Sequence, residues 1–157
     1  MNIRKALPED SSVVGRVHSD AWKSAYRGIF PDDYIDNDNA SKRAEEFLES
    51  VKDGKCTYFI LEESGQAAGI VKTCEDNNNL EIESIYILEE HRGKGLGGQF
   101  IDYIKTYKPY DSIFLWVLEV NTKARRFYEQ NGFKVHGKFR TISRGVILNQ
   151  LKYVLFL

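Results

Sequence analysis

The sequence predicts an α/β fold in which helices cover both faces of a mixed, mostly antiparallel sheet. Three patterns indicate this fold class. Apolar residues repeat at a helical spacing up to about residue 50, and they alternate as in strands from about residue 57. Turn-forming sequences separate three successive strand-like runs, which predicts antiparallel hairpins. Helix-like and strand-like runs alternate after residue 91, so the expected element order is βααβββαβαββ.

The first half of the chain should begin with a strand over Asn2–Leu7. Pro8–Ser11 then carries a helix-start signal, and the amphipathic helix that follows should end near Gly28. A second helical segment is predicted from about residue 31 through residue 50, with one charged side and one apolar side. The three strands of the hairpin region are expected over Thr57–Glu62, Ala67–Cys74 and Leu80–Leu88.

The second half should begin with the glycine-rich segment His91–Gly98 and a helix that closes at Lys108-Pro109. No linker, repeat or low-complexity tract divides the chain, so we expect one domain over residues 1–157. The remaining elements are expected as strands over Ser112–Leu118, Phe133–Arg140 and Leu148–Leu157, with a helix over Thr122–Gln130.

Composition excludes several classes of protein. Of the 157 residues, 42% are hydrophobic and 29% are charged, which is typical of a folded globular chain rather than a disordered one. The formal net charge of −1 gives no overall field toward nucleic acid or anionic lipid, so neither partner is expected. No apolar run reaches the ~20 residues of a membrane span, and no secretory signal is visible. We therefore expect a cytoplasmic protein.

Cysteine and histidine usage predicts no metal site. The chain has two cysteines, too few for a disulfide scaffold and without the paired spacing of a zinc site. Cys56 and Cys74 are therefore expected to be small apolar residues of the core or surface. His18, His91 and His136 are scattered, without the spacing that places two ligands on one helix face.

The glycine-rich segment at residues 92–98 follows a predicted strand and opens a predicted helix. Backbone N–H groups converge on an anion in that context, and glycines let the anion approach the main chain closely. A dinucleotide-binding turn is excluded because three antiparallel strands precede the segment, and a Walker motif is excluded because no Gly-Lys-Ser/Thr occurs. A tight turn that serves packing alone is the alternative. The predicted anion-binding residues are Arg92, Gly93, Lys94, Gly95, Leu96, Gly97 and Gly98.

This segment resembles the acetyl-CoA signature Arg/Gln-x-x-Gly-x-Gly/Ala of the GNAT (GCN5-related) N-acetyltransferases. A second GNAT motif resembles residues 121–133, and segments 22–28 and 31–34 are similar to the PaiA-like polyamine acetyltransferase branch. The resemblance covers essentially the whole chain. The residues that match the two GNAT motifs are Arg92, Gly95, Gly97, Asn121, Ala124, Phe127, Tyr128, Gly132 and Phe133.

The resemblance implies a GNAT fold whose sheet splays between its fourth and fifth strands, with acetyl-CoA as co-substrate and no metal. The thioester carbonyl would be held by a backbone N–H at Ile85, Tyr86 or Ile87, with Ile87 the expected donor. The pyrophosphate would rest on amides from Gly93 to Gly98. Asn121 is expected to cap a helix and to contact the coenzyme. A homodimer is common in the family, and no feature of this sequence specifies one.

The resemblance also implies catalytic roles. Tyr128 matches the general acid of the family and would protonate the departing thiolate; a core tyrosine is the alternative. Glu81 and Glu83 lie two apart in a predicted strand and so share one face, where either could act as base through a water molecule. Glu81 occupies the place of the catalytic glutamate of histone-acetylating members, and Glu83 is nearer to Ile87. Solvated carboxylates, with no dedicated base, remain the alternative.

The expected acceptor is a small cationic amine such as a polyamine. Acidic residues gather at positions 32–38 and 75–90, and an acidic, aromatic wall would attract a cation. Aspartates that cap a short helix are the alternative reading of the first cluster. A non-catalytic acyl-CoA sensor and a protein or peptide N-acetyltransferase are the alternative functions. The expected acceptor contacts are Trp22, Tyr26, Tyr34, Glu81 and Glu83.

Overall fold

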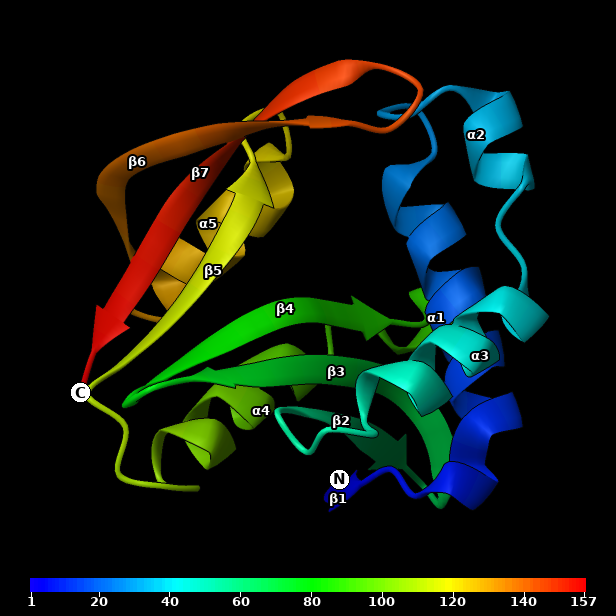
Figure 1. Cartoon of the computed structure of the whole chain (residues 1–157), viewed down its shortest axis with the longest axis horizontal. Coiled ribbons are helices and arrows are strands. Elements are labelled where there is room, and N and C mark those ends of the chain that lie inside the picture. Colours follow the sequence, from blue (N-terminus) through cyan, green and yellow to red (C-terminus); the bar gives the residue numbers. More distant parts are fainter.

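In a computed structural model that describes residues 1–157, seven strands form one mixed sheet in the order β1-β2-β3-β4-β5-β7-β6 (Figure 1). All neighbouring strands are antiparallel except β4 and β5, which confirms the predicted α/β class. The strands are β1 (Asn2–Lys5), β2 (Cys56–Glu63), β3 (Gln66–Asp76), β4 (Asn79–Ile87), β5 (Ser112–Leu118), β6 (Lys134–Ser143) and β7 (Ile147–Phe156). The helices are α1 (Ser11–Tyr26), α2 (Asp32–Asp36), α3 (Ala40–Ser50), α4 (Leu96–Lys105) and α5 (Thr122–Gln130).

The prediction of one helical segment from residue 31 to residue 50 is wrong. Two helices, α2 and α3, replace it, and they are separated at Asn37–Asn39. Asn39 is extended, with φ −150° and ψ 159°, and its side chain accepts a hydrogen bond from the backbone N–H of Lys42. This N-cap starts a new helix, which residue periodicity alone did not indicate. No helix of the chain is both long and apolar enough to cross a membrane.

Helices pack on both faces of the N-terminal half of the sheet (Figure 1). On one face, α1 and α3 bury Val14, Val17 and Phe47 against β2 and β3. On the other face, α4 packs against β2, β3 and β4. The close approach of α1 to α3 depends on Gly15, since a Cβ there would lie 2.3 Å from the carbonyl oxygen of Ala40.

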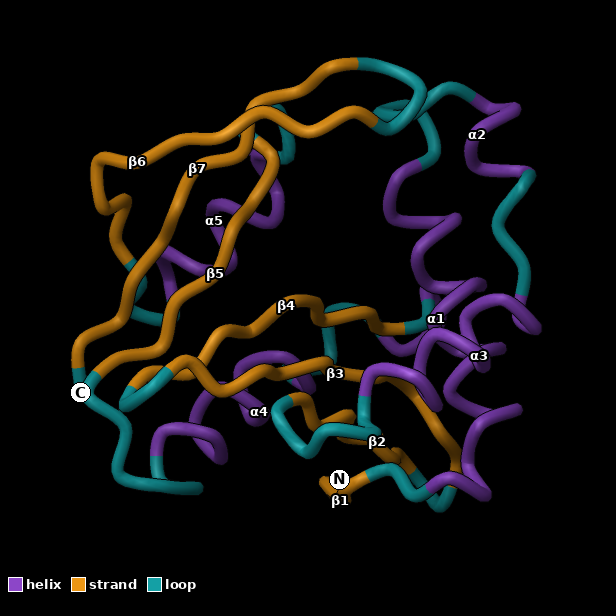
Figure 2. The backbone as a smooth tube through the Cα atoms, viewed as in Figure 1, coloured by secondary structure: helices purple, strands orange, loops and turns teal.

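Strands β4 and β5 pair over only a short stretch and then diverge (Figure 2). Their register ends at the pair Glu81–Phe114, whereas β4 continues to Ile87 and stays paired with β3. The other neighbour of β5 is β7, which pairs with it along its whole length. The sheet therefore splays between its fourth and fifth strands, as the sequence resemblance implied.

The two cysteines form a disulfide, so the prediction of two separate apolar residues is wrong. Cys56 and Cys74 face one another in the register of β2 and β3, with their Cα atoms 4.1 Å apart. The pairing depends on the register of the hairpin between β2 and β3, which a count of cysteines cannot supply. The disulfide joins the two strands at the end of the sheet where β4 begins.

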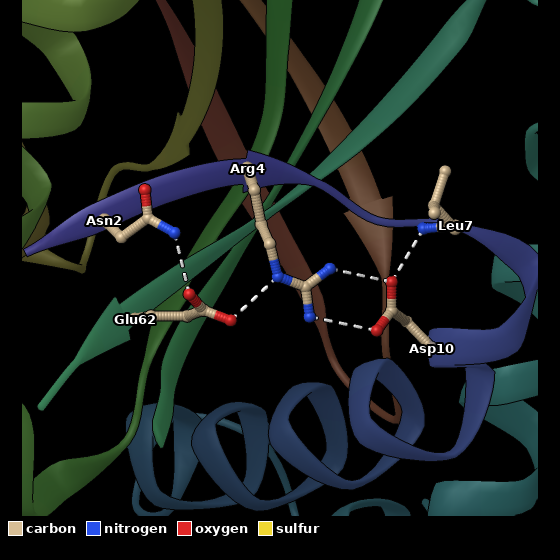
Figure 3. A network of polar contacts seen from close by, with 5 residues as sticks. All are labelled: Asn2, Arg4, Leu7, Asp10 and Glu62. Carbon is tan, nitrogen blue, oxygen red and sulfur yellow. Dashed lines mark hydrogen bonds and ion pairs between the residues drawn. The ribbon is translucent and has the colours of Figure 1, made fainter. Parts of the chain in front are cut away.

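A polar network fastens the N-terminal strand to the hairpin beside it (Figure 3). The guanidinium of Arg4 makes two parallel bonds to the carboxylate of Asp10, at 2.9 and 3.0 Å, and a third bond of 2.7 Å to Glu62 on β2. Asn2 donates to the other oxygen of Glu62, and the backbone N–H of Leu7 donates to Asp10. The bonds from Arg4 lower the pKa of Asp10 from its ordinary value of 3.8.

We expect Asp10→Asn to destabilise the protein by about 1 kcal/mol at neutral pH, because Arg4 is partly exposed and water weakens the pair. The lowered pKa means that the folded state favours the charged carboxylate. Its stabilisation is therefore present above the ordinary pKa and is lost as the pH falls through the lowered one. Urea unfolding at several pH values checks this, with Glu9→Gln as control because Glu9 has no ion-pair partner. An equal loss of unfolding free energy in Asp10→Asn at neutral and at strongly acidic pH would contradict this prediction.

Candidate active site where β4 and β5 diverge

Backbone N–H groups at the end of β4 lack a strand partner. The N–H of Leu88 donates to the carbonyl of Ala68 on β3 at 2.9 Å. Hydrogen bonding alternates along an antiparallel ladder, so Tyr86 also bonds to β3, whereas the N–H groups of Ile85 and Ile87 point away from it. They point toward the side from which β5 has departed. Two donors are thereby left for a ligand at the splay.

A cavity of about 560 Å³ opens at this splay. Its walls come from α1, β4, the glycine-rich turn, β5 and α5, so it joins segments from most of the chain. Of the predicted coenzyme contacts, the cavity lining includes Ile85, Tyr86, Ile87, Arg92, Gly93, Gly95, Leu96, Gly97, Gly98, Asn121 and Tyr128. The lining also includes residues that the sequence did not single out, among them Ser24, Trp116, Lys123 and Gln150.

The glycine-rich turn presents the amino end of α4 to the cavity. Gly93 and Gly95 have φ values of 76° and 80°, which side chains with a Cβ rarely adopt. The first helical bond runs from the N–H of Gln99 to the carbonyl of Gly95, so the N–H groups of residues 96–98 have no partner within the helix. No side chain caps them. The helix end is therefore able to bind an anion.

The two basic residues of this turn are engaged in other bonds. Arg92 donates to the carbonyl of Ile87 at 2.9 Å, and to the carbonyl of Ala21 and the hydroxyl of Ser24 on α1 at 3.2 and 2.6 Å. It therefore ties the end of β4 to α1. Lys94 lies outside the cavity lining and bonds to Glu63 at 3.0 Å. Sequence reasoning missed both roles, because each partner comes from a distant element.

The α5 residues of the second motif take distinct positions. The side chain of Asn121 accepts a bond from the N–H of Ala124 at 3.2 Å, so it caps α5 as predicted. Tyr128 lines the cavity with its ring against Phe127 and Phe133, at centroid distances of 5.1 and 5.7 Å. Burial raises the pKa of Tyr128, and the nearby Tyr26 adds to the shift. The phenol is therefore protonated at neutral pH and is able to donate a proton.

The two glutamates of β4 differ in their surroundings. The register shifts between Lys72 and Thr73, which leaves Glu83 as an extra residue in a bulge of β4. Glu83 lines the cavity and forms a 2.6 Å ion pair with Lys72. Glu81 lies outside the cavity lining and has no ion-pair partner. Burial raises the pKa of Glu81, and the charge of Glu83 raises it further, so Glu81 is more basic than an ordinary glutamate.

The predicted acidic wall at residues 32–38 is partly neutralised by ion pairs. Asp32 and Asp36 both pair with Arg27, at 3.2 and 3.0 Å. Asp38 pairs with Arg43 at 2.6 Å and accepts a bond from Ser19. These pairs hold the segment after α1 in place and reduce its negative charge, whereas Asp33 has no ion-pair partner and Arg27 is shared by two carboxylates.

The three aromatic residues predicted to contact the acceptor do not lie together in the cavity. Tyr26 lines it, whereas Trp22 and Tyr34 do not. Trp22 is 6% exposed, and the guanidinium of Arg43 already lies 5.2 Å from its ring centroid. Trp22 and Tyr34 belong to an aromatic cluster that packs the α1–α2 region against Leu118 at the end of β5. Sequence alone did not distinguish this packing role from ligand contact.

Gly97→Ala should destabilise the protein by about 1–3 kcal/mol, because a Cβ at Gly97 would lie 2.8 Å from the ring of Phe127. Gly98→Ala is the matched control: its Cβ would meet Asn131 at an ordinary 3.5 Å, and alanine favours the helix. Urea unfolding of the two variants checks this prediction. Equal midpoints would show that α4 and α5 are not packed as closely as described.

Comparisons with known proteins agree with this geometry. A family model described as acetyltransferase (GNAT) family matches residues 19–133. A probable N-acetyltransferase of Mycobacterium tuberculosis is 29% identical over 143 residues, which cover 88% of this chain and 82% of the relative. The spermidine N(1)-acetyltransferase of Thermoplasma acidophilum is 27% identical over 143 residues, with 86% and 89% covered.

A similar fold occurs in the crystal structure of the PaiA N-acetyltransferase from Thermoplasma acidophilum in complex with coenzyme A. The TM-score is 0.78 and the identity 21%, with 99% of this chain and 98% of that one covered. At this identity the likeness supports the fold alone. The family model, which spans most of the sequence, carries the assignment: the chain belongs to the GNAT acetyltransferase family.

Proposed function

We propose that the protein transfers an acetyl group from acetyl-CoA to a small primary amine by direct attack. One observation carries the proposal: unpaired amides at the end of β4 and at the amino end of α4 border the same cavity. A diphosphate fits the helix end, and a thioester oxygen fits a strand amide. The coenzyme A in the PaiA structure of similar fold supports this choice of donor.

The residues around the cavity have separate roles in this reaction. The N–H of Ile87 polarises the thioester carbonyl and stabilises the negative charge that develops on its oxygen. The amine attacks the carbonyl carbon, and the C–S bond then breaks. Tyr128 gives its proton to the departing thiolate. A covalent acetyl-enzyme on cysteine is not used, because both cysteines are in the disulfide.

Glu81 removes the proton that the ammonium group must lose. Its carboxylate lies on the same face of β4 as Glu83, opposite Leu80 and Ile82, which point into the core. Glu81 is free of ion pairs, and its raised pKa brings it closer to the working pH of a general base. A water molecule carries the proton, since Glu81 lies outside the cavity lining.

Spermidine is one candidate acceptor, because one relative is named a spermidine N(1)-acetyltransferase. The free negative charge expected for a polyamine site is reduced here by the pairs of Arg27 and Arg43. A non-catalytic acyl-CoA sensor and a protein or peptide N-acetyltransferase are the other functions to test. A sensor has no need of the protonated Tyr128, and it would bind acetyl-CoA without releasing free thiol in the presence of any amine.

Tyr128→Phe should lower kcat by about 100-fold or more, since proton transfer contributes that much, and should leave the Kd for acetyl-CoA unchanged. Release of free thiol measures turnover, and calorimetry measures binding. Tyr107→Phe is the control, because Tyr107 lies just after α4, packs its ring on Phe59 and is outside the cavity. An unchanged kcat in Tyr128→Phe would remove Tyr128 from the mechanism.

Glu81→Gln should remove the acidic limb of the pH profile of kcat/KM. In the unaltered enzyme, activity rises as the pH passes through the raised pKa of Glu81, because only the carboxylate accepts the proton. Glu83→Gln is the comparison and should retain that limb. Loss of the limb in Glu83→Gln alone would transfer the role to Glu83. Its retention in both variants would show that the amine loses its proton to solvent.

A further inference from the structure

The face of the sheet that bears Glu81 continues across β5 into an aromatic surface. Glu81 is the register partner of Phe114, and partners in a sheet point to the same face. Trp116 lies two residues further along β5, so it shares that face and lines the cavity. The alternate residues of β5, Ile113 and Leu115, are buried in the core on the opposite face.

Two cations lie on these aromatic rings. The guanidinium of Arg140 on β6 is 4.4 Å from the ring centroid of Trp116, and the ammonium of Lys152 on β7 is 4.5 Å from that of Phe114. We call these four side chains the cationic platform. The Nε of Arg140 donates to Gln150, which also lines the cavity, at 2.7 Å. Its two terminal nitrogens are left without a bond.

No carboxylate forms an ion pair with the cationic platform. Neither Arg140 nor Lys152 has an acidic group within ion-pair distance, although most cations elsewhere near the site do. Glu83 across the splay is already paired with Lys72. Glu81 and Asp76 are the unpaired carboxylates on this side of the sheet, and the charges of Asp76 and Arg140 both act on Glu81. The terminal nitrogens of Arg140 and the ammonium of Lys152 have no ion-pair partner, so a ligand end that lies against them is favoured when it is negatively charged.

We propose that the acetyl acceptor is a small amine that also carries a carboxylate, which the cationic platform binds. The planar guanidinium of Arg140 lies 4.4 Å from the ring centroid of Trp116, and its two terminal nitrogens can bond to both oxygens of a carboxylate, while Lys152 supplies a second charge. Glu81 and Glu83 would then lie near the amine end of the acceptor, and the cationic platform near its carboxylate end. This inference rests on the proposed function and names the acceptor class of the same site.

Acceptors that differ in one terminal group test the inference. With acetyl-CoA as donor, release of free thiol is measured with γ-aminobutyrate, butylamine and putrescine, whose termini are negative, neutral and positive. Matched amino acids, monoamines and diamines with shorter and longer carbon chains vary the distance between the amine and the terminal group. Spermidine is included. We expect the best amino acid to exceed its neutral and cationic counterparts in kcat/KM by about tenfold or more, as for hydrogen bonds to charged groups.

Platform variants then test whether the preference originates at these residues. Arg140→Gln and Lys152→Gln should each remove most of the advantage in kcat/KM of the amino acid over the neutral amine, since only the amino acid has a carboxylate to bind there. Arg140→Lys keeps the charge and should lose part of the advantage. Lys105→Gln, on the opposite face of the sheet in α4, is the control, and thermal unfolding verifies that every variant folds.

Each outcome separates the two proposals. Faster transfer to spermidine, putrescine or butylamine than to any amino acid would overturn the inference and leave the N-acetyltransferase intact. A preference for amino acids that survives in both platform variants would also overturn it. A weaker Kd for acetyl-CoA in those variants would assign the platform to the coenzyme instead. No thiol release with any amine, despite binding of acetyl-CoA, would contradict the proposed function itself.

Discussion

The departure of β5 from β4 after the pair Glu81–Phe114 is the constraint on which the site depends. A continuous sheet would pair the N–H groups of Ile85 and Ile87 with β5, and no ligand could reach them. An unpaired buried donor costs about 1–3 kcal/mol, so such groups are retained where water or a ligand can satisfy them. The cavity at the splay provides that access, and the same opening exposes the amino end of α4.

Packing at both ends of the splay keeps it open. At the end of β4, the bonds of Arg92 to Ile87 and α1 fix the backbone beside the free amides. At the far end of β5, Leu118 packs with the aromatic cluster around Trp22. The β6–β7 turn reaches the same region, where Gly145 lies against Tyr34 (Figure 1). The donors are thereby held in place before a substrate arrives, which is the condition for electrostatic catalysis.

Much of this arrangement is predictable because it depends on local sequence. Periodicity located β5 and α5 at their observed bounds, and two short motifs placed the glycine-rich turn and Tyr128 at one cavity. Features that depend on contacts between distant segments were not predictable. The Cys56–Cys74 disulfide requires the β2–β3 register, and the bonds of Arg92 require the position of α1. The same reason explains why a run of aspartates suggested an acidic wall whose charge ion pairs reduce.

Amide NMR of the folded protein during a titration with acetyl-CoA tests whether the free amides of β4 and α4 bind the coenzyme. The account predicts that the largest changes occur at the backbone amides of Ile87, Leu96, Gly97 and Gly98, with the diphosphate at α4 and the thioester at β4. S-Acetylpantetheine, which keeps the thioester but lacks the diphosphate, should move Ile87 alone among these amides, at higher concentration. Saturable binding of acetyl-CoA with these amides unmoved, and others shifted, would contradict the account.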